Sequence, residues 1–404
     1  MKPSLNLPKN LLDKSKTYVV AVSFGPDSMA LLSLLIEEHY QVQVAHVNYH
    51  RRDESNLEQS QLEQFCLRHD IPLFVLDVQH TPVGNFQHEA RVMRYNFFDE
   101  VAKEIGAAAI LTAHHQDDDL ETAMMQIERG GYHDYYGINT RGYWRTTSVI
   151  RPLLNFTKSQ LLDYCHGHDI PYAVDASNLK PIYTRNRFRK TIATWDLQTI
   201  QTTRNTIQLK NDLIAKHQQN ILPFITKRML NMHTYLNWEP QEQFLFWFEK
   251  AKHEGFFFPI TQTFLYKVKQ STQSNKPNQT IQLSKGWFLE KAYEQLWIIN
   301  QSWVKPYRFR SNQKDKATPL IQFHLHELTI EHQTFIVRSA KPTDQITIKD
   351  YRSSFRRLAI DWKLPLFLRK VWPVLTTTKG EVFYIPRFQK NLDNQAKKWF
   401  EILE

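Results

Sequence analysis

Six residues between two apolar runs form the first group whose side chains could do chemistry. They follow a β-like run at residues 18–22, precede a helix-like run at 29–36, and read Ser23-Phe24-Gly25-Pro26-Asp27-Ser28. A turn from strand to helix binds phosphate, because the first helical N–H groups lack intrahelical partners and the helix dipole adds partial positive charge. Ser23, Asp27 and Ser28 are also helix-capping residue types, so an ordinary capped turn is the alternative.

A second group combines basic and aromatic side chains. Arg91 lies three residues before Arg94 and four before Tyr95, so the three share one face of a helix predicted over 89–105. Arginine holds phosphate oxygens bidentately, which suits a phosphate turn that contains no lysine. The alternative is a solvated helix face on which these arginines pair with Glu89.

A third group is acidic and follows a strand predicted at residues 108–112. Asp117, Asp118 and Asp119 would start a helix and suit its dipole, but the dipole does not account for the histidines before them or for Glu121. Helical spacing of three and four residues lets Asp117, Asp118 and Glu121 converge on one point. Such a focus suits Mg²⁺ or an ammonium group, whereas the His-x-x-x-His or cysteine-rich spacing typical of zinc is absent.

The elements that must position these groups alternate between strand and helix. Strand-like runs at 18–22, 42–48, 73–76 and 108–112 enclose helix-like runs at 29–36, 56–68 and 89–105. This pattern predicts an α/β fold with a doubly wound, mainly parallel sheet, which binds ligands at the carboxyl ends of its strands. Each of the three groups lies at or close to such an end. The sequence therefore predicts one composite site.

The remainder of the chain differs in composition. In residues 193–300, the first part is nearly free of glycine, and apolar residues recur there at helical spacing. This pattern predicts a small, mainly helical middle domain whose aromatic residues form its core. Residues 301–404 hold 19 Lys and Arg against 10 Asp and Glu, whereas the first 300 residues are nearly neutral. A basic excess confined to one end predicts a polyanionic partner, most simply nucleic acid, for a small α+β C-terminal domain. Residues 1–192 form the predicted catalytic domain.

Composition narrows the class of protein. The 404 residues are 42% apolar and 23% charged, which is typical of a soluble globular protein, and no apolar run approaches the ~18 residues of a membrane span. We therefore expect a cytoplasmic protein without a membrane partner. Cys66 and Cys165 are expected to be buried thiols and cannot supply a four-thiolate metal site. The oligomeric state is left open, with a homodimer as one candidate.

The turn at residues 23–28 resembles the Ser-Gly-Gly-x-Asp-Ser loop of the ATP pyrophosphatase superfamily, which cleaves ATP to AMP and pyrophosphate. The departure is Phe24, where that superfamily has a second glycine. A bulky residue at positive φ costs about 1–2 kcal/mol, so either Phe24 has a negative φ or the loop is reshaped.

The other motifs make the resemblance specific. His46-Val47-Asn48, Glu89-x-Ala-Arg91-x-x-Arg94-Tyr95 and His114-His115-x-Asp117-Asp118-x-x-Glu121-Thr122 follow the loop, and Arg151-Pro152-Leu153-Leu154, Asp175–Asn178 and Arg185-Asn186-Arg187-Phe188-Arg189 come after them. Together they resemble the tRNA(Ile)-lysidine synthetase family over nearly all of residues 18–190. This family usually has Gln at the position of Asp119. The C-terminal part, including Arg356 and Arg357, resembles the same family.

The resemblance implies an enzyme that uses ATP and Mg²⁺ to join free L-lysine to the wobble cytidine of tRNA(Ile) with a CAU anticodon, through an adenylated intermediate. Ser23, Phe24, Gly25, Pro26, Asp27 and Ser28 would bind the nucleotide, and Asp27 with Asp117 the metal. Arg91 would stabilise the α-phosphate, and Asp118 and Glu121 would hold the lysine amine. Asp117 or His114 would assist metal binding or proton removal.

The expected tRNA contacts are Arg185, Arg187, Arg189, Arg356 and Arg357, since basic side chains interleaved with aromatic ones suit RNA. One alternative is another ATP pyrophosphatase that modifies tRNA or forms amides. The other is a tRNA-binding protein without catalytic activity.

Overall fold

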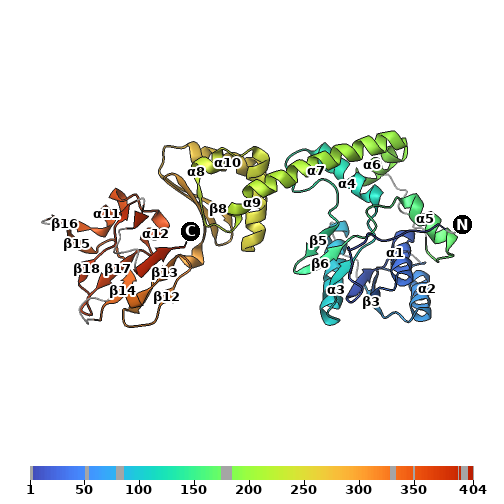
Figure 1. Cartoon of the computed structure of the whole chain (residues 1–404), viewed down its shortest axis with the longest axis horizontal. Coiled ribbons are helices and arrows are strands. Elements are labelled where there is room, and N and C mark those ends of the chain that lie inside the picture. The colour runs from blue at the N-terminus through green and yellow to red at the C-terminus, as the bar shows by residue number, and fades with distance from the viewer. Residues whose placement is uncertain are drawn as a thin grey trace. The chain divides into compact units, whose positions relative to one another are not determined.

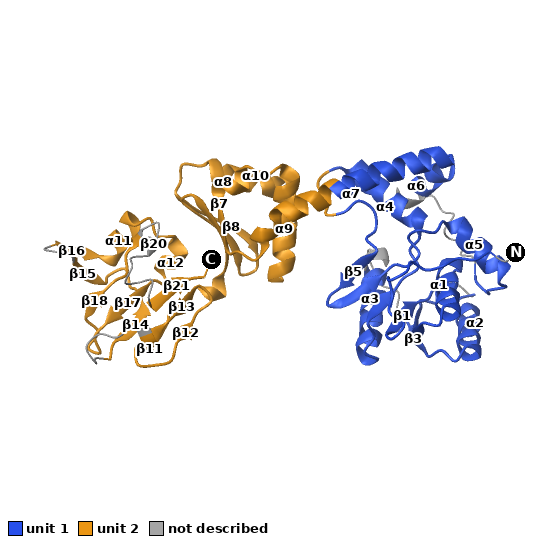
Figure 2. Cartoon of the chain, in the orientation of Figure 1, with its two compact units in different colours: residues 1–130, 135–212 blue, residues 131–134, 213–404 orange. Residues whose placement is uncertain are grey.

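The computed structural model describes residues 3–50, 54–78, 86–173, 184–327, 334–348, 351–389, 391–392 and 399–403. The chain divides into two compact units, coloured separately in Figure 2. Unit 1 comprises residues 1–130 and 135–212, and unit 2 comprises residues 131–134 and 213–404. The boundary falls within the long helix α7 (Leu197–Ile225).

Unit 1 is built on a six-stranded sheet in the order β3-β2-β1-β4-β6-β5 (Figure 1). All neighbouring strands are parallel except β5, which pairs antiparallel with β6. This confirms the predicted doubly wound, mainly parallel sheet. The elements are β1 (Thr17–Ala21), α1 (Pro26–Glu37), β2 (Gln41–Asn48), α2 (Ser55–Arg68), β3 (Leu73–Asp77), α3 (Phe86–Glu104), β4 (Ala109–Leu111), α4 (Gln116–Arg129), β5 (Arg141–Trp144), β6 (Thr147–Ile150), α5 (Lys158–Gly167) and α6 (Thr184–Ala193).

The central strand β1 is covered on both faces. Tyr18 and Val20 belong to a buried cluster that includes apolar residues of α1, α2 and α5. Val19, between them, belongs to a second cluster with α3. Because successive strand residues point to opposite faces, an almost continuous apolar strand is what a sheet with helices on both sides requires.

This layering leaves the carboxyl edge of the sheet for ligands. The order of connection reverses between β1 and β4, since β1 continues to β2 on one side while β4 pairs with it on the other. Such a switch point is where ligands bind in open α/β sheets. The turns after β1, β4 and β6 all reach this edge.

Unit 2 contains helices followed by several small antiparallel sheets (Figure 1). Its first part is helical as predicted, but the strand-like runs near residue 286 form a four-stranded sheet, in the order β7-β10-β9-β8. The elements of this part are β7 (Met229–Asn231), α8 (Met232–Leu236), α9 (Pro240–Glu254), α10 (Gln262–Gln273), β8 (Asn278–Ser284), β9 (Trp287–Ala292) and β10 (Gln295–Asn300). Trp247 and Phe246 are buried, which confirms the predicted aromatic core.

The C-terminal part has α+β composition, as predicted. Its core also takes in Trp297 and Ile299 of β10, so it is continuous with the sheet before it. Its elements are β11 (Arg308–Arg310), β12 (Lys316–Ala317), β13 (Ile321–Phe323), β14 (Ile336–Ser339), β15 (Gln345–Ile348), β16 (Tyr351–Ser354), α11 (Phe355–Asp361), α12 (Leu366–Arg369), β17 (Pro373–Thr376), β18 (Val382–Tyr384), β19 (Phe388–Gln389), β20 (Asn391–Leu392) and β21 (Phe400–Ile402), with short 3₁₀ turns at Gln301–Trp303 and Leu325–Glu327. Among the described residues, no helix combines the length and apolar content of a membrane span.

Candidate active site

The turn from β1 to α1 folds around the hydroxyl of Ser28. Ser28 Oγ accepts a hydrogen bond from Ser23 N (3.2 Å) and donates one to Gly25 O (2.9 Å). Gly25 is the N-cap of α1 and Pro26 is its first residue, and no side chain among the described residues caps this start. The ordinary capped turn is therefore not what forms here. The N–H groups of Asp27 and Ser28 have no intrahelical partner and are suited to an anion.

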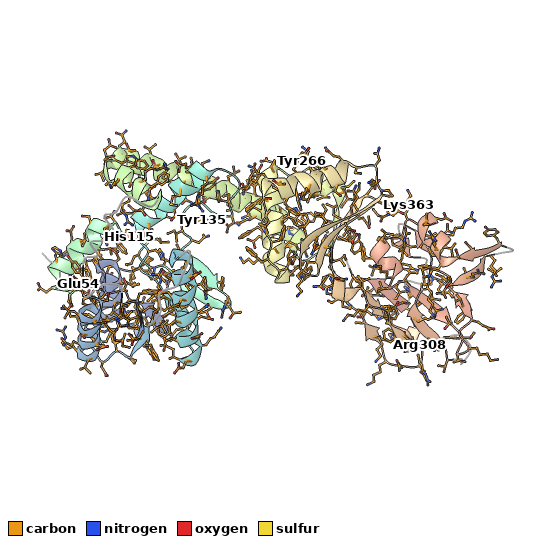
Figure 3. The ribbon with its side chains drawn as sticks, turned by 180° about the vertical axis from the view of Figure 1, so that it is seen from behind. Glu54, His115, Tyr135, Tyr266, Arg308 and Lys363 are labelled. Atoms are coloured by element: carbon orange, nitrogen blue, oxygen red, sulfur yellow. The ribbon has the colours of Figure 1, made fainter. Side chains whose placement is uncertain are left out.

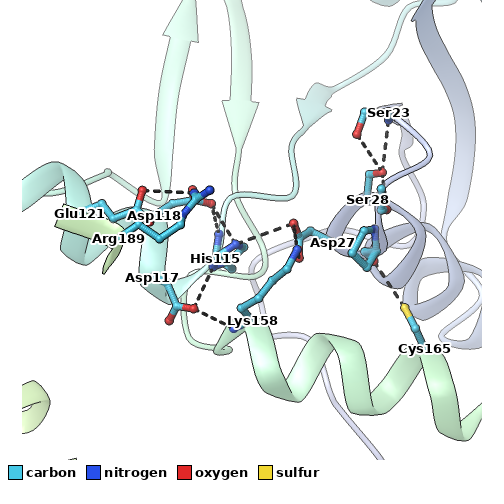
Figure 4. A network of polar contacts seen from close by, with 12 residues as sticks. Ser23, Asp27, Ser28, His115, Asp117, Asp118, Glu121, Lys158, Cys165 and Arg189 are labelled. Atoms are coloured by element: carbon cyan, nitrogen blue, oxygen red, sulfur yellow. Dashed lines mark hydrogen bonds and ion pairs between the residues drawn. The ribbon is translucent and has the colours of Figure 1, made fainter. Parts of the chain in front are cut away.

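Acidic side chains surround His115, which precedes α4 (Figure 4). The His115 side chain is 7% exposed, and its Nε2 lies 3.4 Å from Asp118 Oδ2 and 3.8 Å from Asp27 Oδ2. Its Nδ1 lies 3.9 Å from Asp117 Oδ2. The acidic turn after β4 thus reaches the turn from β1 to α1 (residues 23–28), which we call the phosphate-type turn. Figure 3 labels His115 from the opposite side of the molecule.

The two adjacent histidines differ in their surroundings. His114 Nδ1 lies 2.9 Å from Thr112 Oγ1, whereas His115 lies among the carboxylates. The backbone N of His115 also donates to Asp118 Oδ2 (3.2 Å), which closes the start of α4. The sequence pattern indicated His114, although His115 is the histidine among the carboxylates. Adjacent residues of an extended segment point to opposite sides, and the sequence does not show which of the two sides faces the site.

Lys158, which the sequence patterns did not single out, joins two of the acidic residues. Its Nζ donates to both carboxylate oxygens of Asp27, at 2.6 Å each, and its backbone N donates to Asp117 Oδ2 (3.2 Å). The side chains of Lys158 and Asp27 are 37% and 26% exposed. Both members of the predicted metal-binding pair therefore contact the start of α5.

Asp27 and Asp117 carry hard oxygen ligands of the kind that Mg²⁺ prefers. Among the described residues, no group of three or more His, Cys, Asp or Glu side chains is arranged to hold a metal ion. The protein would thus supply one or two carboxylates, and phosphate oxygens and water would complete the coordination, as is usual for Mg²⁺ beside nucleotides. Asp27 already binds a cation, the Lys158 ammonium, at both oxygens. The residues fit Mg²⁺ on this basis.

Glu121 is buried and bonded to Arg189 of α6. Arg189 Nε donates to Glu121 Oε1 (2.7 Å) and Nη2 donates to Oε2 (3.3 Å), and Nη2 lies 3.8 Å from Asp118 Oδ1. Burial acts to lower the pKa of Arg189, but the carboxylates outweigh it and raise that pKa. Arg187 pairs with Glu128 of α4. These two predicted tRNA contacts therefore lie against α4. The side chain of Arg185, together with residues 175–183, lies outside the described residues.

Arg91 is at the same sheet edge but outside this network. Its guanidinium carbon lies 4.6 Å from the centre of the Tyr95 ring. Arg151 lies directly after β6 and near Arg91. Its burial and the charge of Arg91 lower the pKa of Arg151. Arg151 Nη1 donates to Asn139 O (2.7 Å), while its buried Nε has no partner among the described residues. Two guanidinium groups thus adjoin one aromatic ring, and no carboxylate of the described chain forms an ion pair with either.

The basic C-terminal part presents arginine beside tyrosine. Arg357 Nη1 donates to Tyr351 OH (2.7 Å), and its guanidinium lies 5.6 Å from the centre of that ring. Tyr351 is 58% exposed, and Arg356 is exposed next to it. Arg308 and Lys363, labelled in Figure 3, are further exposed cations of this part.

The sequence is similar to that of known proteins. A family model described as the PP-loop domain matches residues 3–195. The tRNA(Ile)-lysidine synthase of Mycoplasma mycoides subsp. mycoides is 30% identical over 358 residues, which cover 85% of this chain and 85% of that protein. The chain belongs to the tRNA(Ile)-lysidine synthase family.

Further matches cover a smaller share of this chain and of the matched protein. The tRNA(Ile)-lysidine synthase of Malacoplasma penetrans is 37% identical over 190 residues, or 46% of this chain and 64% of that protein. The chain thus spans less than two thirds of the length of the first curated lysidine synthases that it matches. A solved structure, the U34-tRNA thiolase NcsA from Methanococcus maripaludis, is 15% identical with a TM-score of 0.44, covering 52% of this chain and 76% of that one.

Two departures from the usual lysidine synthase pattern have defined surroundings. Phe24 has a φ of 62° and a fully buried side chain, so the alternative of a negative φ is excluded. Its ring packs in the same cluster as Met29 of α1, and its carbonyl accepts a hydrogen bond from Ala173 N (2.9 Å). Asp119 contacts a different segment from its acidic neighbours, because its Oδ1 accepts a hydrogen bond from Ile138 N (2.5 Å). Burial raises the pKa of Asp119.

Replacing Phe24 with glycine, the usual residue of this loop, is expected to lower the free energy of unfolding by about 1–4 kcal/mol. Relief of the positive φ returns about 1–2 kcal/mol, but losing a fully buried phenylalanine costs about 3–5 kcal/mol. Phe24→Ala loses the ring and keeps the strained backbone, so it should be less stable than Phe24→Gly by about 1 kcal/mol. Urea denaturation of both variants measures the difference, and equal stabilities would show that φ at residue 24 carries no strain.

Proposed function

We propose that this chain joins free L-lysine to C2 of the wobble cytidine in tRNA(Ile) with a CAU anticodon. The cytidine C2 oxygen first attacks the α-phosphorus of ATP, and pyrophosphate leaves. The ε-amine of lysine then attacks C2, the bond from C2 to the adenylated oxygen breaks, and AMP leaves. The function named for the relatives supports this reaction, as does the residue arrangement at the sheet edge.

The observation that carries the proposal is the meeting of two unlike sites. Asp27, Asp118 and His115 connect the phosphate-type turn of α1 with the acidic start of α4. Among the described residues, four carboxylates (Asp27, Asp117, Asp118 and Glu121) are gathered here with Lys158 and Arg189, which bind Asp27 and Glu121. Helix N–H groups without an intrahelical partner suit a triphosphate, and a cluster of carboxylates suits an ammonium substrate. ATP and lysine both meet that description.

The side chains divide between the two steps. Ser23, Gly25 and Ser28 hold the departing pyrophosphate, and Asp27 with Asp117 hold Mg²⁺, which when bound offsets phosphate charge. Arg91 places preorganised positive charge at the α-phosphate.

Asp118 and Glu121 receive the lysine amine in this proposal. An amine with an unperturbed pKa near 10.4 is mostly protonated at neutral pH, so it must lose a proton before it can attack. Asp117 and His114 are the candidates for that proton transfer. Because Glu121 is bonded to Arg189, the amine would share its carboxylate with that guanidinium or replace it.

The cysteines do not favour a thiolase. Cys66 and Cys165 are both buried and free, and burial raises the pKa of each thiol to about 11. A thiol that is almost fully protonated at neutral pH is a poor sulfur nucleophile and metal ligand.

The exposed Tyr351–Arg357 pair and Arg356 support tRNA docking by unit 2. Replacing Arg356 and Arg357 with glutamine is expected to weaken tRNA binding and to reduce the slope of log affinity against log salt by about 1–2, since each lost phosphate contact lowers the slope by about 1. Filter binding at several salt concentrations measures the slope. Lys14→Gln/Lys16→Gln removes the same charge from exposed positions of unit 1 and serves as the control. An unchanged slope in the arginine variant would place the RNA elsewhere.

The full reaction is tested by incubating the protein with ATP, Mg²⁺, labelled lysine and total tRNA. We expect label only in tRNA(Ile) with the CAU anticodon, and AMP release that requires both tRNA and lysine. tRNA binding without lysine-dependent AMP release would instead indicate the non-catalytic alternative.

A further inference from the structure

Lys158 occupies a position that is unfavourable for a lysine within its own helix. It is the first residue of α5, where a cation opposes the helix dipole. The helix start is already capped, because Thr157 Oγ1 accepts a hydrogen bond from Gln160 N (3.2 Å). Local helix stability therefore does not explain this side chain.

The packing of α5 explains where the lysine reaches. Cys165 Sγ donates to Pro26 O (3.4 Å), and Leu161 lies in the same buried cluster as Leu32 of α1. This contact brings the start of α5 beside the start of α1, so that Lys158 Nζ meets Asp27 (Figure 4). The lysine ammonium thus lies at the phosphate-type turn, although 131 residues separate it from Asp27 in the sequence.

The pair between Lys158 and Asp27 cannot persist unchanged when nucleotide binds. Both oxygens of Asp27 are bonded to Lys158 Nζ, yet the proposed function uses this carboxylate for Mg²⁺. Once Asp27 is engaged elsewhere, the ammonium needs another anion. The side chains of Asp27 and Lys158 are 26% and 37% exposed, so solvent reaches the ion pair and it stabilises the protein only weakly. Each partner can therefore exchange the other for a ligand.

We propose that Lys158 is the phosphate-binding lysine of this site, held by Asp27 in the free protein and transferred to phosphate oxygens of ATP when nucleotide binds. This rests on the proposed function, in which the bound phosphates leave as pyrophosphate. The turn itself contains no lysine, so the sheet edge obtains this charge from α5. No covalent bond changes in the exchange, since one ammonium moves from a carboxylate to a phosphate.

The decisive experiment measures binding of inorganic pyrophosphate in EDTA by titration calorimetry, with four proteins. These are the wild type, Lys158→Met, Asp27→Asn and the double variant. Asp27→Asn releases the ammonium and should bind pyrophosphate more tightly than the wild type. The double variant should bind about 10- to 100-fold more weakly than Asp27→Asn, the range expected for one lost charged hydrogen bond. Equal affinities of these two variants would overturn the proposal, because a lysine that only positions Asp27 has no effect once Asp27 is replaced.

A second measurement uses ATP with Mg²⁺. Lys158→Met should weaken ATP binding at least tenfold, and Lys158→Arg should restore part of it, whereas Lys9→Met, at an exposed lysine of unit 1, should leave it unchanged. Wild-type ATP affinity in Lys158→Met would contradict the proposal. The double variant removes both members of the ion pair and leaves no unpaired charge, so it also serves if Lys158→Met folds poorly. Pyrophosphate binding needs neither tRNA nor lysine, so its outcome is independent of whether lysidine forms.

Discussion

An Asp118→Ala variant is expected to lose lysine incorporation while it still releases pyrophosphate from ATP in the presence of tRNA. Asp118 is 15% exposed and lies beside Glu121's partner Arg189, at the acidic end of the network. Removing one partner of a desolvated charge pair, here Asp118 and the lysine ammonium, costs about 2–5 kcal/mol, so lysine incorporation should fall by about 30- to 5,000-fold at limiting lysine. Labelled lysine transfer and pyrophosphate release, measured in the same reaction, separate the two steps.

The separation is expected because, in the described contacts, Asp118 is joined to the phosphate-type turn through His115. His115 lies between them, with its Nε2 3.4 Å from Asp118 Oδ2 and 3.8 Å from Asp27 Oδ2. Asp118 also accepts a hydrogen bond from His115 N, so alanine removes part of a helix cap at a cost of about 1 kcal/mol. Asp118→Asn keeps an acceptor there and removes only the charge. Loss of lysine incorporation in both variants would therefore follow from charge and not from folding.

Asp119 supplies a matched control on the same helical turn. Its carboxylate accepts a hydrogen bond from Ile138 N, and the ion pairs described around His115 involve Asp27, Asp117 and Asp118 instead, so Asp119→Asn should retain lysine incorporation. If Asp118→Ala and Asp119→Asn show the same lysine dependence as the wild type, the amine of lysine is held elsewhere. If both lose pyrophosphate release, the start of α4 serves the nucleotide and not the amino acid.

Features that depend on neighbouring residues could be predicted from the sequence. The alternation of apolar runs predicted the parallel sheet, because the middle residues of β1 are buried against helices on both faces and are therefore apolar or aromatic. Helical spacing predicted that Asp118 and Glu121 can converge on one point, and both lie beside Arg189. The position of each group after a strand then placed the turns of β1 and β4 at one edge.

Features that depend on contacts between distant segments could not be predicted in this way. Lys158 and Asp27 are 131 residues apart, and Arg189 and Glu121 are 68 apart. No local spacing indicates either pair. The positive φ of Phe24 was also unpredictable, because only burial of its ring among α1 residues makes the strained backbone tolerable. Likewise, β7 joins the sheet of unit 2 by pairing with β10, far along the chain.

An Arg91→Ala variant is expected to lower the rate of pyrophosphate release by about 10²- to 10³-fold, the loss typical of removing one preorganised charge from a transition state. Arg91 and Arg151 adjoin the ring of Tyr95, and no described carboxylate forms an ion pair with either. Placing like charges together is unfavourable unless an anion offsets them. The α-phosphate, whose charge is redistributed as pyrophosphate leaves, is the anion that the proposed reaction brings to this edge.

Single-turnover release of pyrophosphate from ATP and tRNA measures this step without lysine. Arg94→Ala, one helical turn from Arg91, removes the same charge from an exposed position and should reduce the rate far less. Arg91→Lys should recover only part of the rate, because a point charge cannot hold two phosphate oxygens in the fixed geometry of a guanidinium. A wild-type rate in Arg91→Ala would show that Arg91 does not stabilise the α-phosphate. Arg151 would then be the residue to replace next, because its buried Nε has no partner in the described chain.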